Sequence, residues 1–192
     1  MPPRQFRRYA EARRMNKEIL QTNRLIIRAW TLDDAEALFE ICRDPEVMLH
    51  IGTGKPYQSI NDARRFLRWA ASYQEENGFC RWAVVERASQ KIIGSCGFVR
   101  LERSGEIELG YLFARRVWGK GYATEAASAC IRHGFERLRF AEVIALTDTG
   151  HDASQRVLEK IGFTYRGVEN YDGQSDAVYV AVNPGDEARA IA

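Results

Sequence analysis

The apolar positions of the chain follow two spacings, and their order predicts a mixed α+β fold. Apolar residues three or four apart indicate helices after Thr31, after Ser59, and over residues 123–138 and 152–161. Short apolar or alternating runs indicate strands over 24–30, 81–86, 91–101, 106–113, 142–147, 163–168 and 177–182. Because the three strands before residue 114 follow one another through short turns, a simple doubly wound parallel sheet is excluded.

Local signals mark the ends of these helices. Thr31 and Ser59 are each followed three residues later by an aspartate, a variant of the capping box that opens a helix. Gly162 follows the last predicted helix and is typical of a C-cap glycine. A loop rich in Gly and Pro is expected over residues 47–58.

Composition is that of one globular domain. The chain has 192 residues, 45% hydrophobic and 28% charged, which is enough to bury a sizeable core. No apolar run approaches the roughly 20 residues that span a bilayer, and we see no secretory signal, so a cytoplasmic protein without a membrane partner is expected. The four cysteines form no C-x-x-C pair, so we expect small buried side chains and no metal site.

Charge is unevenly distributed along the chain. The formal net charge is +2, but residues 1–18 hold six basic and two acidic residues, which leaves the remainder slightly acidic. We therefore expect a basic N-terminal extension (1–21), a central domain (22–183) and a C-terminal tail (184–192). Contact of the basic segment with RNA or a ribosome stays open as a minor alternative.

A glycine turn between a predicted strand and a predicted helix is the main candidate site. Residues 116–124 read R-x-x-G-x-G-x-A-T, and such a turn exposes backbone N–H groups at the positive end of a helix dipole. The segment lacks a Walker A pattern, and Thr124 stands where a dinucleotide-binding fingerprint needs its third glycine. A different kind of phosphate site is therefore indicated.

Several segments in order resemble the GNAT acyltransferase superfamily, in particular its ribosomal-protein alanine N-acetyltransferase branch. The resemblance covers roughly residues 22–183 and implies a central, mostly antiparallel twisted sheet with a splayed parallel strand pair and helices on both faces. The matching segments are Thr22–Arg28, Asp44–Met48, Ile93–Phe98, Trp118–Ala126 and Ser154–Phe163.

The resemblance implies acetyl-CoA as cosubstrate and assigns residues to it. Leu112 and Phe113 would contact pantetheine in the opening of the sheet, and His151 and Ser154 would hold the cofactor at the start of the last helix. The pyrophosphate would lie on residues of the glycine turn, where glycine lets the backbone approach closely. These residues are Arg116, Val117, Gly119, Lys120, Gly121, Tyr122, Ala123 and Thr124.

The implied reaction is direct attack of a neutral primary amine on the thioester. Neutralising an α-amino group at pH 7 costs about 1–1.4 kcal/mol, whereas a lysine amine costs about 4.6 kcal/mol. An N-terminal amine therefore needs only a weak base. Glu106 and Glu108 share one strand face and either could be that base, with Glu108 favoured because it lies closer to the opening.

Two departures from the family pattern affect the proton transfers. His151 replaces the asparagine that usually begins the last motif, and it could hold pantetheine or act as a base. Leu158 stands where many members have a tyrosine acid, so Ser154 is the nearest candidate donor to the thiolate. These departures also keep an acyl-CoA-binding module without turnover as the alternative function.

The acceptor is not identified by the sequence. A protein N-terminus and a small-molecule amine both remain candidates, because acceptor loops vary without changing the fold. A homodimer is also compatible with the chain.

Overall fold

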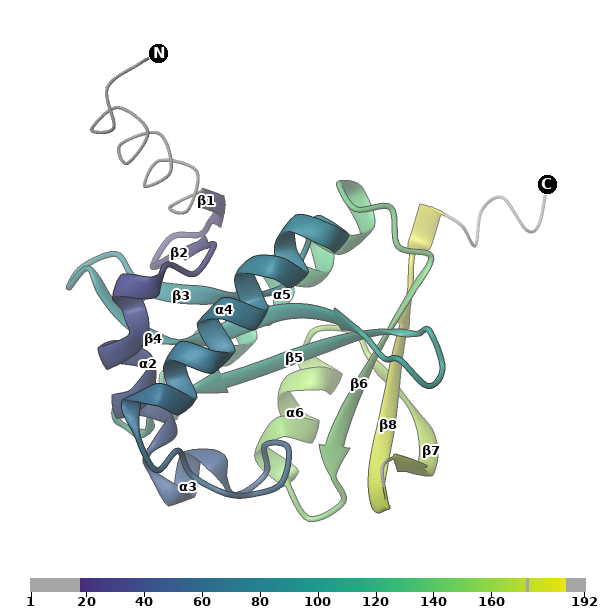
Figure 1. Cartoon of the computed structure of the whole chain (residues 1–192). Coiled ribbons are helices and arrows are strands. Elements are labelled where there is room, and N and C mark those ends of the chain that lie inside the picture. Colours follow the sequence, from purple (N-terminus) through teal and green to yellow (C-terminus); the bar gives the residue numbers. More distant parts are fainter. Residues whose placement is uncertain (1–17, 172, 186–192) are drawn as a thin grey trace.

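One eight-stranded sheet organises the protein, which we describe from a computed structural model over residues 18–171 and 173–185 (Figure 1). The strands lie in the order β1-β2-β3-β4-β5-β6-β8-β7. Among the described strands, only β5 and β6 pair in parallel, which confirms the expected mostly antiparallel sheet with one parallel pair. The strands are β1 (Glu18–Gln21), β2 (Leu25–Arg28), β3 (Arg81–Glu86), β4 (Lys91–Arg100), β5 (Ile107–Phe113), β6 (Glu142–Asp148), β7 (Thr164–Tyr171) and β8 (Gln174–Val182).

In the described part of the chain, five α-helices pack on the two faces of the sheet. In Figure 1, α4 crosses in front of the sheet and α5 lies behind it; α2 packs with α4, and α6 packs with α5. The helices are α2 (Ala35–Cys42), α3 (Pro45–Met48), α4 (Ile60–Asn77), α5 (Tyr122–Glu136) and α6 (Asp152–Lys160). A 3-10 turn over Leu32–Asp34 leads into α2, and another over Arg115–Val117 precedes the glycine turn.

The helix-start signals are confirmed by the structure. Thr31 and Asp34 form a capping box, as do Ser59 and Asp62 at the start of α4. Asp34 also binds Arg28 on β2 through two hydrogen bonds of 2.7 and 2.8 Å, which ties the turn before α2 to the sheet.

Two elements lie outside the expected pattern. The strand β1 pairs with β2 ahead of the first expected strand, so residues 18–21 extend the sheet. The short helix α3 occupies the start of the expected loop over 47–58, and the Asp44 side chain caps it by accepting from Glu46 N–H. Residues 1–17 of the expected basic extension (1–21) and most of the expected C-terminal tail lie outside the described residues, and residues 18–21 of that extension form β1.

The core between the sheet and α5 is aromatic and tightly packed. Phe98 on β4 is fully buried and makes edge contacts with Trp82 and Phe140. Gly134 on α5 faces this ring: an added Cβ would lie 2.9 Å from the tip of Phe98. All four cysteines are buried and free, as expected. Among the described residues, no helix is long and apolar enough to cross a membrane.

Candidate active site

The parallel strands β5 and β6 diverge and open the sheet. Their ladder has one matched pair, Glu108 with Ile144. On the other side, β5 pairs with β4, and Ala114 N–H donates to Ile93 C=O. In an antiparallel pair only every second residue directs its N–H and C=O groups to the partner strand, so counting back from Ala114 the next such residue is Leu112. The peptide groups of Tyr111 and Phe113 therefore face the opening, whereas those of Leu112 are directed to β4.

The glycine turn has the geometry that a phosphate group requires. Gly119 and Gly121 have φ angles of +73° and +76°, in the left-handed region that favours glycine. The first internal bond of α5 joins Glu125 N–H to Gly121 C=O, and no side chain caps this end. The N–H groups over 122–124 thus point out of the helix without a helical partner, which fits a bound pyrophosphate.

Arg24 holds this turn in place from the N-terminal side of the sheet. Its guanidinium binds Glu125 at 2.6 Å, donates to Lys120 C=O at 2.9 Å and lies 4.4 Å from the centroid of the Tyr122 ring. Burial opposes ionisation of Glu125, but hydrogen bonds from Thr22 and Arg24 outweigh it and lower the pKa of the carboxyl. The turn is therefore fixed by a contact between residues 101 positions apart in sequence.

A cavity of about 1110 Å³ opens beside the divergent strands. Its walls come from the end of α2 and the loop before α4, from β3, β4 and β5, from the end of β6 and start of α6, and from β8. Three of the expected site residues with reactive groups line it: Glu108, His151 and Ser154. Leu112 also lines it.

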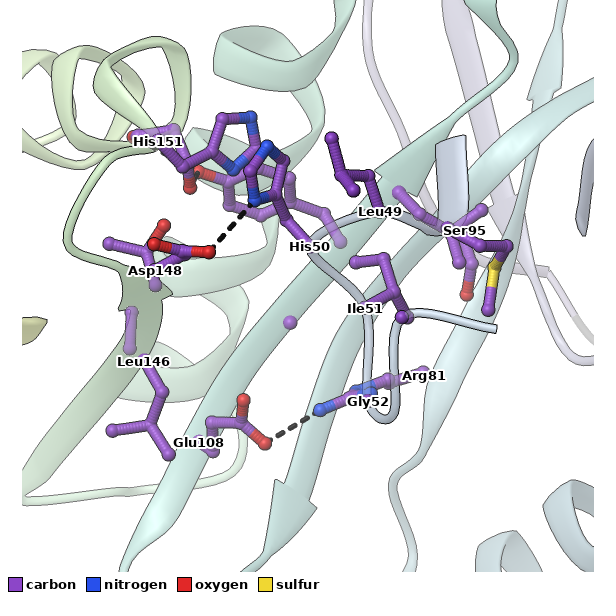
Figure 2. Close-up of a pocket in the computed structure, with 18 of the residues that line it drawn as sticks. Leu49, His50, Ile51, Gly52, Arg81, Ser95, Glu108, Leu146, Asp148 and His151 are labelled. Atoms are coloured by element: carbon purple, nitrogen blue, oxygen red, sulfur yellow. Dashed lines mark hydrogen bonds and ion pairs between the residues drawn. The ribbon is translucent and has the colours of Figure 1, made fainter. Parts of the chain in front are cut away.

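Glu108 is held at one end of the cavity by an arginine (Figure 2). Arg81 Nη2 lies 2.6 Å from Glu108 Oε2, and the Glu108 side chain is only 12% exposed. The Arg81 guanidinium lies over Gly110, where a Cβ would come within 2.5 Å of Nε. Glycine at position 110 therefore makes room for the ion pair. Glu106, the other candidate base, does not line the cavity and binds Arg166 at 2.9 Å.

Two histidines meet at another part of the cavity. His50 and His151 stack with ring centroids 4.1 Å apart, and His50 Nδ1 lies 3.1 Å from Asp148 Oδ2 (Figure 2). Burial, with the neighbouring His50, lowers the pKa of His151, and the carboxylates of Asp148 and Asp152 only partly oppose this. His151 is therefore neutral at pH 7 and able to accept a proton.

Ser154 meets a tyrosine that the sequence did not single out. Tyr111 on β5 places its hydroxyl 3.0 Å from Ser154 Oγ and 3.3 Å from Ser154 C=O. Burial raises the pKa of Tyr111, so the phenol keeps its proton at neutral pH. Leu158 on α6 is 1% exposed and has no group to donate.

The structure separates the expected cofactor residues into two regions. The residues at the start of α5 and in the turn before it do not line the cavity. Of the two basic residues there, Arg116 donates to Ile92 C=O at 3.1 Å, and Lys120 is exposed. Trp118 donates its indole N–H to Phe113 C=O at 2.7 Å, so the turn folds back onto the end of β5.

Sequence reasoning missed His50, Arg81, Tyr111 and Asp148, which also line the cavity. None of them belongs to a motif, and Tyr111 alternates with Leu109 and Phe113 as an ordinary core residue would. Only the folding together of β5, β6, α6 and the loop after α3 brings them into one site.

Comparison with known proteins agrees with this architecture. The family model described as "Acetyltransferase (GNAT) domain" matches residues 24–164, most of the chain. The chain belongs to the GNAT family. By that membership it is an acyltransferase. One relative is the uncharacterized N-acetyltransferase YoaA of Bacillus subtilis (strain 168), which is 36% identical over 152 residues; the match covers 78% of this chain and 85% of the relative.

Solved structures share the GNAT fold. A GNAT-family acetyltransferase from Bacillus anthracis superposes with a TM-score of 0.74 at 25% identity, covering 85% of this chain and 98% of that chain. The ribosomal L7/L12 alpha-N-protein acetyltransferase RimL, solved in complex with coenzyme A, has a TM-score of 0.75 at 15% identity, covering 86% and 98%. At that identity the second match shows the fold alone.

Proposed function

We propose that the protein transfers an acetyl group from acetyl-CoA to a primary amine by direct attack in a ternary complex. The observation that carries this proposal is that Glu108, His151 and Ser154 line one cavity beside the open strand pair. The uncapped glycine turn at the start of α5 supports coenzyme A as the carrier, and the RimL neighbour was solved with coenzyme A.

The proposed cofactor contacts fall into two groups, one for the pyrophosphate and one for pantetheine. The turn from Arg116 to Thr124 would hold the pyrophosphate, and the peptide groups of Tyr111 and the N–H of Phe113 would hold pantetheine in the opening. Leu112 would contribute a side-chain contact from the cavity wall. Acetyl-CoA supplies the activated acyl group when bound.

Base candidates lie within reach of the cavity. Glu108 and His151 both line it, and His151 is neutral at pH 7, so either can take the proton of an attacking amine. An α-amine needs less help than a lysine amine, which favours an N-terminal amine or a small-molecule amine of similar pKa.

A covalent acyl-enzyme route has less support than direct transfer. Cys42 lines the cavity, but burial raises the pKa of its thiol to about 12. The thiolate is the nucleophilic form of cysteine, so Cys42 is a poor acyl acceptor at neutral pH.

The test is release of free coenzyme A thiol from acetyl-CoA with a panel of amines. The panel includes peptides with free N-termini, the same peptides blocked at the N-terminus, polyamines and aminoglycosides. Thiol release that depends on a free amine supports the proposal. Tight acetyl-CoA binding with no thiol release across the panel would favour the alternative, a binding module without turnover. That alternative is motivated by the apolar, buried Leu158, which cannot donate a proton.

A further inference from the structure

The ion pair between Arg81 and Glu108 brings to the cavity a cation that no sequence motif indicates. We propose that Arg81 is a positioning residue for acetyl transfer: it holds Glu108 in the orientation in which the carboxylate takes the proton of the acceptor amine. Glu108 would contact the amine, and Arg81 would act only through Glu108. This inference rests on the acetyl-transfer function proposed above.

Three neighbouring strands build the path of the Arg81 side chain to Glu108. Arg81 on β3, Gly97 on β4 and Gly110 on β5 are register partners, so they form one row across the sheet. The arginine therefore crosses β4 at a position without a side chain. Glu108 lies two residues before Gly110 on β5, so it projects from the same face as this row.

Gly110 fits closely under the guanidinium. A Cβ at position 110 would lie 2.5 Å from Arg81 Nε, 2.7 Å from Cζ and 2.8 Å from Nη2, so any other residue would have to displace the group. The Arg81 backbone is also held, because its C=O accepts the Trp30 indole N–H at 2.8 Å. Backbone and guanidinium are thus both fixed relative to β5.

The polar contacts of Arg81 are incomplete, which a purely structural role does not explain. Nη2 lies 2.6 Å from Glu108 Oε2. Nε is buried and has no hydrogen-bond partner among the described residues. A buried donor without a partner costs stability, and such groups are found where function requires the geometry.

Glu108 keeps one oxygen available for the reaction. Its side chain is 12% exposed, and Oε2 is held by Arg81. Oε1 accepts no hydrogen bond from a described residue, and Glu108 lines the cavity, so Oε1 is available to an amine there. A carboxylate this buried is costly to hold without a paired cation, and an unrestrained glutamate rotates among several orientations. Arg81 offsets the first cost and restricts the rotation.

The proton balance leaves Arg81 unchanged. The amine nitrogen bonds to the acetyl carbon, and the carbon–sulfur bond breaks with its electron pair on sulfur. One proton of the amine passes to Glu108 Oε1 and then to water, and the thiolate takes one proton from water. The guanidinium keeps its charge throughout, so Arg81 neither gives nor takes a proton.

The first experiment is chemical rescue of Arg81→Ala. Its acceptor is the amine of the panel above that releases the most thiol, at saturating acetyl-CoA. Misplacing the base should lower kcat about tenfold or more, with an unchanged Kd for acetyl-CoA. Guanidinium chloride, far below denaturing concentrations, should restore part of kcat in Arg81→Ala but none in Glu108→Gln, and sodium chloride at equal ionic strength should restore none.

The matched control is Arg28→Ala. Arg28 lies on another strand, binds Asp34 through two hydrogen bonds and does not line the cavity. Its loss should lower the free energy of unfolding and leave kcat within about twofold of the wild type. A loss of stability is thereby separated from a loss of base position.

The second experiment displaces the guanidinium without removing it. Gly110→Ala should lower kcat although both charged groups remain, and Gly110→Ala combined with Arg81→Ala should be no slower than Arg81→Ala alone, because the methyl acts through the guanidinium. Arg81→Lys keeps the charge and should retain a larger share of kcat than Arg81→Ala. Gly110→Ala and Arg81→Lys carry the test if Arg81→Ala does not fold, as judged by circular dichroism.

Three results would overturn the inference. They are a kcat of Arg81→Ala within about twofold of the wild type, a loss that guanidinium does not reduce, and a loss in Arg81→Ala/Glu108→Gln equal to the product of the single losses. If Arg81→Ala does not fold, a wild-type kcat in Gly110→Ala would overturn it. A wild type that binds acetyl-CoA but releases no thiol with any amine would instead reject the proposed function.

Discussion

At the scale of single residues, environment separates side chains that the sequence presents as equivalents. Glu106 and Glu108 are both carboxylates near the start of β5. Glu108 lies in the cavity against Arg81, whereas Glu106 is bound by Arg166 outside it. Sequence spacing could place them on one strand face, but only their contacts distinguish their roles.

We expect Glu108→Gln to lower kcat by about a hundredfold or more with amine acceptors, since general base catalysis contributes 10²- to 10⁴-fold. The matched variant Glu106→Gln makes the same chemical change outside the cavity and should keep kcat within about twofold. Steady-state kinetics with saturating acetyl-CoA measures both. Equal losses in the two variants would show that Glu108 has no special part in catalysis.

The histidine pair predicts a specific pH dependence. His151 accepts a proton only when neutral, and burial lowers its pKa, so an activity that needs it is retained at pH 7 and lost as pH falls below about 6.5. His50 contributes to lowering that pKa. His50→Gln should therefore raise the pKa of His151 and move the acid limb to higher pH.

The measurement is the pH profile of kcat/KM in the wild type, His50→Gln and His151→Ala. His151→Ala should abolish the limb. A limb that stays in place in both variants would assign it to another group, such as Glu108.

At the scale of elements, the glycine turn and α5 form one unit. The left-handed φ of Gly119 lets the chain turn into a helix whose first N–H groups have no helical partner. Arg24, which precedes Glu125 by 101 positions in the sequence, holds the turn through Glu125 and Lys120. The motif is local, but its rigidity is a tertiary property.

Gly119→Glu should weaken acetyl-CoA binding by a factor on the order of ten to a hundred, because a carboxylate would face the pyrophosphate across a short distance. The control is Gly78→Glu at the end of α4. Gly78 has a similar φ of +79° and, like Gly119, no atom within 4 Å of an added Cβ, so backbone strain is matched.

Calorimetric titration with acetyl-CoA compares the two variants with the wild type. The midpoint temperature of thermal unfolding should fall by similar amounts in both variants, since both place a side chain in the left-handed region. A Kd that changes equally in both variants would remove the turn from the binding site.

At the scale of the whole molecule, packing between the sheet and α5 reverses what helix propensity predicts. Gly134→Ala would stabilise an isolated helix by about 1 kcal/mol. Here the new methyl would lie 2.9 Å from the buried Phe98 ring, so we expect a net loss of about 1–3 kcal/mol in the free energy of unfolding.

Urea unfolding tests this with Ser128→Ala as the control on the same helix. Ser128 is exposed, so its replacement should be neutral or stabilise by a few tenths of a kcal/mol. A Gly134→Ala variant as stable as the wild type would mean that the aromatic core can move aside.

The sequence by itself determined the elements and the family. Strand and helix periodicity, the two capping boxes and the glycine turn depend on neighbours in the chain, so they could be identified without coordinates. The same local signals indicated Glu108, His151 and Ser154, because each lies in or beside a recognisable motif. Short-range signals were weakest at β1, a four-residue strand that depends on pairing with β2 and on packing of Ile19 and Leu20 against the core.

Only the tertiary structure decided how the site is completed. Tyr111 reaches Ser154 across 43 positions of sequence, Arg81 reaches Glu108 across 27, and His50 reaches Asp148 across 98. Such contacts arise from the divergence of β5 and β6 and from packing of α6 and the loop after α3 around the opening. The physical reason is that hydrogen bonds and burial act through space, and spacing along the chain carries no record of which distant side chains will meet.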